Sequence, residues 1–216
     1  MCERLYGPFV INIESRQDRL NTIQAEFDKL TMTFICLKAT EGNPVLGCID
    51  SHCRCLEIFI NDPKSEAVFI CEDDAQFNVD KNTLNKHINE FLDSDADAFC
   101  LGFYASNPKP WSKLFFRSND IQTRVAYIVK PKLAKELLHI WRKLYTLIVS
   151  NPKPDNWYKK LYNNLPIKNK AKDIYRGDQI WKLLQQKYCF IIPKFHMVIQ
   201  RPSFSNIENK FVDYKV

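Results

Sequence analysis

The stretch VFICEDDAQF at residues 68–77 places three consecutive acidic side chains directly after a short apolar run. The apolar run predicts a buried strand over residues 67–71, so that Glu72, Asp73 and Asp74 lie at its carboxyl end. In open α/β sheets this edge is where ligands bind. Because side chains alternate along a strand, we expect Glu72 and Asp74 on one side and Asp73 on the other.

Two carboxylates on one side of a strand repel each other, and no basic residue stands beside them in the sequence. A divalent cation relieves this repulsion, and carboxylate oxygens suit Mg²⁺ or Mn²⁺. Such an ion can bridge two phosphates and neutralise a departing diphosphate. The alternative is an acidic turn that caps the next element, and the triplet alone does not decide between the two.

Strands and helices alternate on both sides of this stretch. The hydrophobic periodicity predicts further strands over residues 9–13, 32–37, 98–101, 123–129, 188–192 and 196–200, and helices over 15–30, 50–59, 84–92, 131–148 and 178–186. Ser15 is expected to cap the first helix. The β-α-β opening implies parallel strands joined by a right-handed crossover. We therefore expect an α/β fold with a largely parallel central sheet flanked by helices, and irregular chain over residues 104–119.

The length of 216 residues suits a single domain spanning residues 1–216. The composition, 45% hydrophobic and 26% charged, is typical of globular proteins. Only 5 residues are glycine, and neither a P-loop nor a Rossmann fingerprint occurs. The segment of about residues 151–173 is rich in lysine and asparagine without clear periodicity, which predicts a flexible insertion.

The net charge of +6 fits either a solvated lysine-rich surface or attraction to a polyanion or a nucleotide. No signal-like segment and no apolar stretch of roughly 20 residues is present, which predicts a cytoplasmic protein without a transmembrane segment. The 8 cysteines are then expected to be reduced thiols. Cys53 and Cys55 have the wrong spacing for a zinc knuckle.

Several stretches resemble, in order and over nearly the whole chain, the motifs of glycosyltransferase family 25, which comprises lipopolysaccharide-type and collagen-type sugar transferases. They are VINIESRQDRL at 10–20, ATEG at 39–42, GCIDSH at 47–52, VFICEDDA at 68–75, AYIV at 126–129 with the following Ala134 and Leu137–Leu138, the pair Gly177–Asp178, and QRPSFSNI at 200–207. Two positions depart from the family pattern. Glu41 replaces an aspartate, and Lys130–Pro131 replaces a serine.

The resemblance implies a GT-A-like fold and an inverting hexosyltransferase. The donor would be a nucleotide sugar, a UDP-sugar in the first place, and the acceptor a hydroxyl of a glycan or a glycosylated protein. Inversion requires a carboxylate base for the acceptor hydroxyl and a positive group for the leaving diphosphate. The implied cofactor is Mn²⁺ or Mg²⁺.

The motifs also suggest roles for individual residues. Asp178 is the candidate base, although at the start of a helix it is equally explained as a cap. The candidate metal ligands are Asp74, Glu72 and His196. The candidate nucleotide-sugar contacts are Asn12, Arg16, Arg19, Glu41, Ser51, His52, Glu72, Asp73, Gln200 and Ser205.

Two other functions remain open on the sequence. One is a catalytically silent module that keeps the transferase fold and only binds a glycan or a partner protein. The other is a metal nuclease, which the sequence disfavours because the positive charge gathers in the lysine-rich segment rather than beside the acids. We therefore expect no nucleic-acid partner, and a homodimer is compatible with the sequence.

Overall fold

The computed structural model describes residues 4–62, 64–150, 177–205, 207 and 209–214. The predicted insertion at about 151–173 lies outside the described residues. Among the helices that are described, none is long and apolar enough to cross a membrane. Seven of the cysteines are described, and all of them are free thiols.

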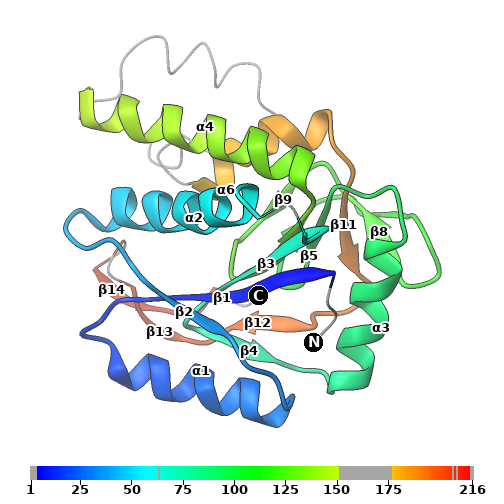
Figure 1. Ribbon diagram of the computed structural model, residues 1–216, viewed down its shortest axis with the longest axis horizontal. Helices are drawn as coiled ribbons and strands as arrows, with labels where there is room; N and C mark the ends of the chain where they lie inside the picture. Colours follow the sequence, from blue (N-terminus) through cyan, green and yellow to red (C-terminus); the bar gives the residue numbers. More distant parts are fainter. Residues whose placement is uncertain (1–3, 63, 151–176, 206, 208, 215–216) are drawn as a thin grey trace.

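An eight-stranded sheet forms the centre of the molecule (Figure 1). Six of its strands run in one direction, and two run against them. This confirms the predicted largely parallel sheet. In spatial order the strands are β2 (Ile35–Lys38), β1 (Leu5–Asn12), β3 (Ala67–Glu72), β10 (Ala126–Val129), β5 (Ala98–Cys100), β11 (Phe190–Pro193), β8 (Phe115–Arg117) and β7 (Lys109–Pro110).

Helices cover both faces of the sheet, with α2 (Pro44–Ile60) and α4 (Pro131–Ser150) on one face and α1 (Gln17–Lys29) and α3 (Lys81–Leu92) on the other (Figure 1). Strand β3 shows why two cores form. Its side chains alternate, so Val68 and Ile70 pack under α2 and α4, while Phe69 and Cys71 pack with α1 and α3. The predicted stripe of α4 is confirmed, since Leu133, Leu137, Leu138, Trp141, Leu144 and Ile148 all belong to or pack against the first core.

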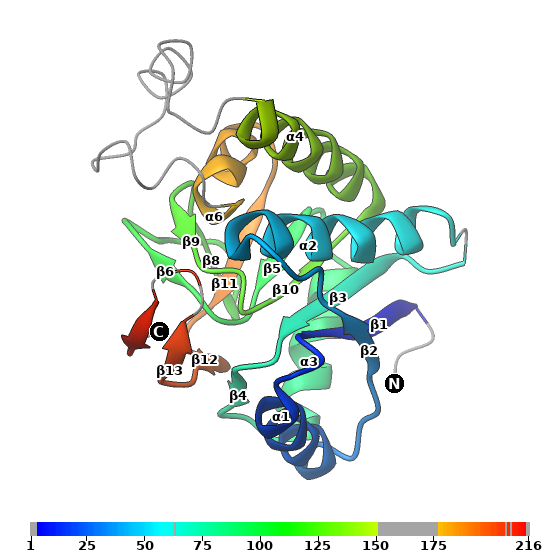
Figure 2. The ribbon, with the colours of Figure 1, turned by 90° about the vertical axis from the view of Figure 1, so that its left-hand side faces the viewer.

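Strand β10 lies between β3 and β5 and runs antiparallel to both. Three short pairs stand outside the main sheet and bring distant segments together: β4 (Ala75–Phe77) with β12 (Val198–Gln200), β13 (Ser203–Ser205) with β14 (Lys210–Val212), and β6 (Tyr104–Ala105) with β9 (Ile121–Gln122). The β4–β12 pair lays the C-terminal segment beside the acidic end of β3 (Figure 2).

The structure corrects several local predictions. Ser15 does not cap α1. It lies in a tight turn closed by the Arg16 N–H to Ile13 O bond, and Arg16 holds the N-cap position without a side-chain hydrogen bond, because a guanidinium offers no acceptor. Helix α2 begins at Pro44, six residues before the predicted start at 50, because the Asn43 side chain caps it and proline suits the first helical turn.

Two further segments differ from their predictions. Residues 104–119 are not wholly irregular, since β8 within them joins the main sheet. The helix predicted over 178–186 is one α-helical turn, α6 (Gly177–Ile180), followed by the 3-10 helix η1 (Trp181–Gln186).

The loop at 39–42 packs tightly against the first turn of α2. Ser51 Oγ donates to Gly47 O and accepts from Thr40 N–H, and a β-carbon at position 47 would lie 2.1 Å from Thr40 O.

Gly47→Ala is therefore expected to destabilise the protein by about 2 kcal/mol, lowering the Tm by roughly 4–8 °C. Circular dichroism melting measures this, with Lys143→Ala on the exposed face of α4 as the control. An unchanged Tm for Gly47→Ala would contradict the close packing.

Candidate active site

All three acidic residues line one pocket of about 330 Å³ at the carboxyl end of β3. The predicted alternation is therefore wrong for Asp73. The strand ends at Glu72, and Asp73 and Asp74 form the turn into β4, where the two-residue repeat of a strand no longer applies. The tertiary structure also supplies the basic neighbour that the local sequence lacks, because α1 places Arg19 beside the acids.

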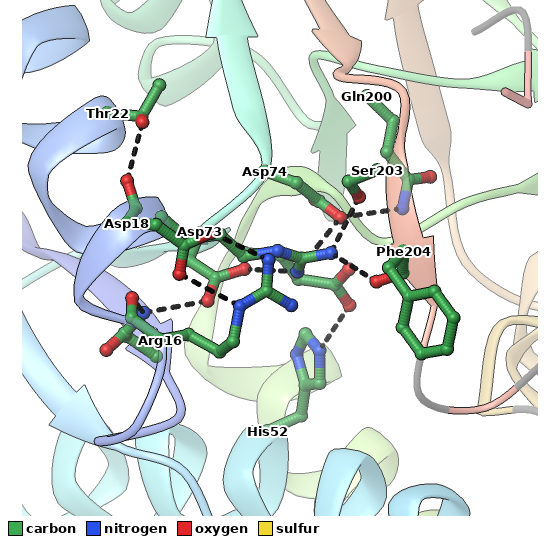
Figure 3. A network of polar contacts seen from close by, with 12 residues as sticks. Arg16, Asp18, Thr22, His52, Asp73, Asp74, Gln200, Ser203 and Phe204 are labelled. Atoms are coloured by element: carbon green, nitrogen blue, oxygen red, sulfur yellow. Dashed lines mark hydrogen bonds and ion pairs between the residues drawn. The ribbon is translucent and has the colours of Figure 1, made fainter. Parts of the chain in front are cut away.

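Asp73 is fully paired within the protein. Its Oδ1 accepts from Arg19 Nη1 at 2.7 Å, and its Oδ2 accepts from Asn12 Nδ2 at 2.8 Å. The other terminal nitrogen of Arg19, Nη2, bonds to the β13–β14 hairpin. It donates to Ser203 Oγ at 2.6 Å and to Phe204 O at 2.9 Å (Figure 3). Asp73 and Arg19 thus join the end of β3 to the hairpin that forms the opposite wall of the pocket.

Asp74 is the acid left incompletely paired. Gln200 Nε2 donates to its Oδ2 at 3.2 Å, and Arg19 Nη1 lies 3.5 Å from the same oxygen. The other oxygen, Oδ1, is buried and has no hydrogen-bond partner. Burial raises the pKa of the Asp74 carboxyl to about 7, and the negative charge of Glu72 adds to this rise. A buried polar oxygen without a partner is uncommon in folded proteins, which singles out Asp74 among the three acids.

Glu72 is held by His52 from α2. His52 Nε2 lies 3.1 Å from Glu72 Oε1, and Figure 3 shows this contact. On its other side, His52 Nδ1 lies 2.9 Å from the Tyr127 hydroxyl. Burial lowers the pKa of His52 to about 4, so the imidazole is neutral at pH 7. Burial opposes ionisation of Glu72, but the hydrogen bond with His52 and the positive charges of Arg124 and Arg19 together outweigh burial and lower the pKa of that carboxyl.

A second pocket of about 340 Å³ adjoins the first. The two share Cys48, Glu72, Gln200, Ile207 and Tyr214 in their walls, so Glu72 faces both. Asp178 lines only the second pocket, and its Oδ2 accepts from Thr123 N–H at 3.3 Å. This contact joins α6 to the segment before β10, so any structural role of Asp178 extends beyond capping its own helix.

Arg124 forms the buried wall of the second pocket. Its Nη2 lies 3.1 Å from Cys48 Sγ, and its guanidinium lies 5.1 Å from the centre of the Trp141 ring. Its Nη1 is buried without a hydrogen-bond partner. The charges of Glu72 and Asp178 help to raise the pKa of Arg124 although burial opposes this, so the guanidinium stays charged.

Most of the residues predicted for the site do gather there. The first pocket is lined by Arg19, Glu41, Ser51, His52, Glu72, Asp73, Asp74, Gln200 and Ser205. Asn12 and Arg16 lie behind it: Asn12 positions Asp73, and Arg16 pairs with Asp18 at 2.9 Å (Figure 3). His196 lines neither pocket; it is exposed and its ring stacks on Phe103 with 4.4 Å between centroids.

Several lining residues were missed by the sequence reasoning. Cys48 lies four residues before His52 in the GCIDSH stretch, and this helical spacing was an available signal. Ser203 and Phe204 stand within the QRPSFSNI stretch, whereas Arg124 carried no comparable signal. Cys48, His52 and Glu72 have ligand atoms within 4.8 Å of one another, which makes them the one candidate metal cluster among the residues that the structure describes.

No family model matches the chain, and no curated protein matches its sequence. Among solved structures, it resembles a glycosyltransferase involved in the glycosylation of the major capsid of PBCV-1, with 12% identity, coverage of 93% of this chain and 94% of that chain, and a TM-score of 0.50. The chain has a GT-A-like glycosyltransferase fold. Mouse xyloside xylosyltransferase 1 also aligns, at 7% identity and a TM-score of 0.43, over 93% of this chain and 84% of that one.

In this fold, the position of the three acidic residues is typical of a ligand-binding site. They stand at the carboxyl end of a central strand of a mainly parallel sheet, where ligands of α/β folds bind. Membership of family 25 stays a prediction, because the likeness lies in the fold.

Proposed function

We propose that the chain is a metal-dependent, inverting glycosyltransferase of family 25 type, which moves a hexose from a UDP-sugar to a hydroxyl of a glycan or a protein-linked acceptor. The observation that carries this proposal is the pair of adjoining pockets that meet at Glu72, one holding the carboxylate cluster and the other holding Asp178. A donor in the first pocket and an acceptor in the second can thus meet beside Glu72, and a transfer reaction requires both substrates to be held together.

The first pocket suits the donor. Asp74, with its unpaired buried oxygen, and Glu72 are the residues that would hold Mn²⁺ or Mg²⁺. The bound ion would neutralise charge on the diphosphate. Asp73 is left out of this set because both of its oxygens are paired, and His196 is left out because it lines neither pocket. Glu41, Ser205 and the Arg19-bound hairpin would enclose the nucleotide.

The second pocket suits the acceptor. The acceptor oxygen bonds to the anomeric carbon, and its proton passes to the Asp178 carboxylate. The bond from the anomeric carbon to the diphosphate oxygen breaks, and its electron pair leaves with the nucleoside diphosphate. Arg124, which lines the same pocket, would supply positive charge near both Glu72 and Asp178. Attack from the pocket opposite the leaving group gives inversion.

The proposed function is tested by incubating the protein with nucleotide sugars and Mn²⁺, and measuring release of the nucleoside diphosphate. We expect one UDP-sugar to be hydrolysed slowly in the absence of acceptor, and a chelator to stop the release. The same ligand should raise the Tm, because it binds only the native state. A raised Tm without hydrolysis or transfer would point instead to the silent binding module, and no response to any nucleotide sugar would contradict the proposal.

Arg19 and Arg16 provide a matched pair for testing the donor pocket. Arg19→Met removes the partner of the buried Asp73 and releases Ser203 and Phe204, so UDP affinity should fall at least roughly tenfold. Arg16→Met removes only an ion pair with the exposed Asp18, so affinity should change less than about twofold. Calorimetric titration with UDP and Mn²⁺ measures both. Equal losses in the two variants would place the nucleotide elsewhere.

A further inference from the structure

We propose that Cys48, His52 and Glu72 form a second cation site, selective for Zn²⁺, which shares Glu72 with the Asp74 site proposed for Mn²⁺. The three side chains offer a sulfur, an imidazole nitrogen and a carboxylate oxygen, the ligands that zinc combines in proteins. A manganese site of the usual kind holds mainly oxygen ligands, so these residues favour a softer metal than the carboxylates beside them.

The backbone places the three ligands without rearrangement. Cys48 and His52 are four residues apart on α2 and therefore share one face of the helix. Glu72 ends β3 opposite them, with its Oε1 3.1 Å from His52 Nε2. All three ligand atoms lie within 4.8 Å of one another, whereas a tetrahedral zinc site spaces them by about 3.5 Å. Rotation of the side chains closes that difference.

The imidazole is already oriented for a metal. Tyr127, buried under α2, lies 2.9 Å from His52 Nδ1 and leaves Nε2 facing Glu72. Ligating histidines commonly have such a fixed partner on their other nitrogen. Cys48 and Glu72 line both pockets, so an ion can enter from solvent and keep a fourth position open toward the pockets.

The positive charge of Arg124 opposes the ion, because its Nη2 contacts Cys48 Sγ at 3.1 Å, and the charge of Arg19 also acts on Glu72. Burial raises the pKa of the Cys48 thiol to about 11 although the charge of Arg124 opposes this rise, so the metal has to displace the thiol proton. The proton of the thiol is released to solvent on binding. The two ionised ligands would together neutralise the ion.

Zinc at this site would inhibit the Mn²⁺-dependent reaction, since it takes Glu72 away from Asp74. This consequence rests on the proposed function, whereas zinc binding itself does not. One equivalent of Zn²⁺ is expected to raise the Mn²⁺ concentration needed for UDP binding several-fold. If UDP never binds, the proposed function fails and the zinc site stands; if UDP binds without any response to zinc, only the inhibitory role fails.

The test uses the reduced full-length protein, stripped of metal, with Co²⁺ as a spectroscopic substitute for Zn²⁺. The wild type should bind one Co²⁺ with the near-ultraviolet charge-transfer band of a cobalt–thiolate bond, and Zn²⁺ should displace it. Cys48→Ser should abolish the band and weaken zinc binding at least tenfold in equilibrium dialysis. Cys36→Ser, which changes an exposed free thiol on β2, should behave as the wild type.

Asp74→Asn should retain the band, because Asp74 is not one of the three ligands. Absence of the band in the wild type, wild-type zinc affinity in Cys48→Ser, or loss of zinc binding in Asp74→Asn would each overturn the site. If Cys48→Ser does not fold, alkylation of the wild-type protein with and without zinc still tests the proposal. Zinc should then slow the alkylation of Cys48 in mass-spectrometric mapping, while Cys36 reacts at an unchanged rate, and an unchanged rate at Cys48 would overturn the proposal.

Discussion

Asp74→Asn is expected to lower transfer by at least a hundredfold and to abolish the Mn²⁺ dependence of UDP binding, while the protein stays folded. Asparagine keeps the shape of the side chain and the contact with Gln200, but it removes the negative charge that a cation requires. The loss should be large because the buried Oδ1 of Asp74 has no hydrogen-bond partner among the described residues, and we propose that it binds the metal.

Without metal, the same variant should be at least as stable as the wild type. A buried carboxylate beside the negative charge of Glu72 opposes folding, and its replacement relieves that cost. A gain of about 1 kcal/mol corresponds to a Tm higher by roughly 2–4 °C. Calorimetric titration of UDP with and without Mn²⁺, together with metal-free melting curves, measures both effects.

The control for Asp74 is Asp80→Asn. Asp80 caps α3 at the surface, and asparagine caps a helix about as well as aspartate, so neither binding nor stability should change. If Asp74→Asn bound UDP with the metal dependence of the wild type, Asp74 would not be a metal ligand, and the acids would be a structural turn.

Asp178→Asn is expected to slow transfer by roughly a hundredfold or more, the usual effect of losing a general base. Donor binding should barely change, because Asp178 lines the second pocket and not the first. The side-chain oxygen of asparagine can still accept from Thr123 N–H, so the fold should be kept. Steady-state transfer rates and UDP titration separate the two effects.

Asp178→Ala distinguishes a base from a structural residue. It removes the contact with Thr123 as well as the carboxylate, so a purely structural Asp178 would cost about 1 kcal/mol of stability and leave turnover largely intact below the melting range. A folded Asp178→Asn protein with near wild-type transfer would refute the assignment as base. Asp73 would then be the next candidate for the base, although its pairing with Arg19 and Asn12 makes it a poor one.

The sequence by itself determined the local elements and the chemistry at one edge of the sheet. The apolar run before Glu72 made β3, and the helical spacing from Leu133 to Leu144 made the buried stripe of α4. Both patterns repeat within a few residues, and hydrophobic burial acts on such short repeats directly. The β-α-β opening predicted the parallel pairing of β1 with β2, because a helix that connects two neighbouring strands brings the chain back to run in the same direction.

Only the tertiary structure decided how the acids differ from one another. Asp73 became a paired structural residue because α1 brings Arg19 to it across 54 positions, while Asp74 kept an unpaired oxygen. Cys48 and Glu72 met because α2 packs over the end of β3, and Asp178 reached the second pocket through its contact with Thr123. Contacts between residues so far apart depend on how whole elements pack, and no periodicity within the chain encodes which partner each charge will find.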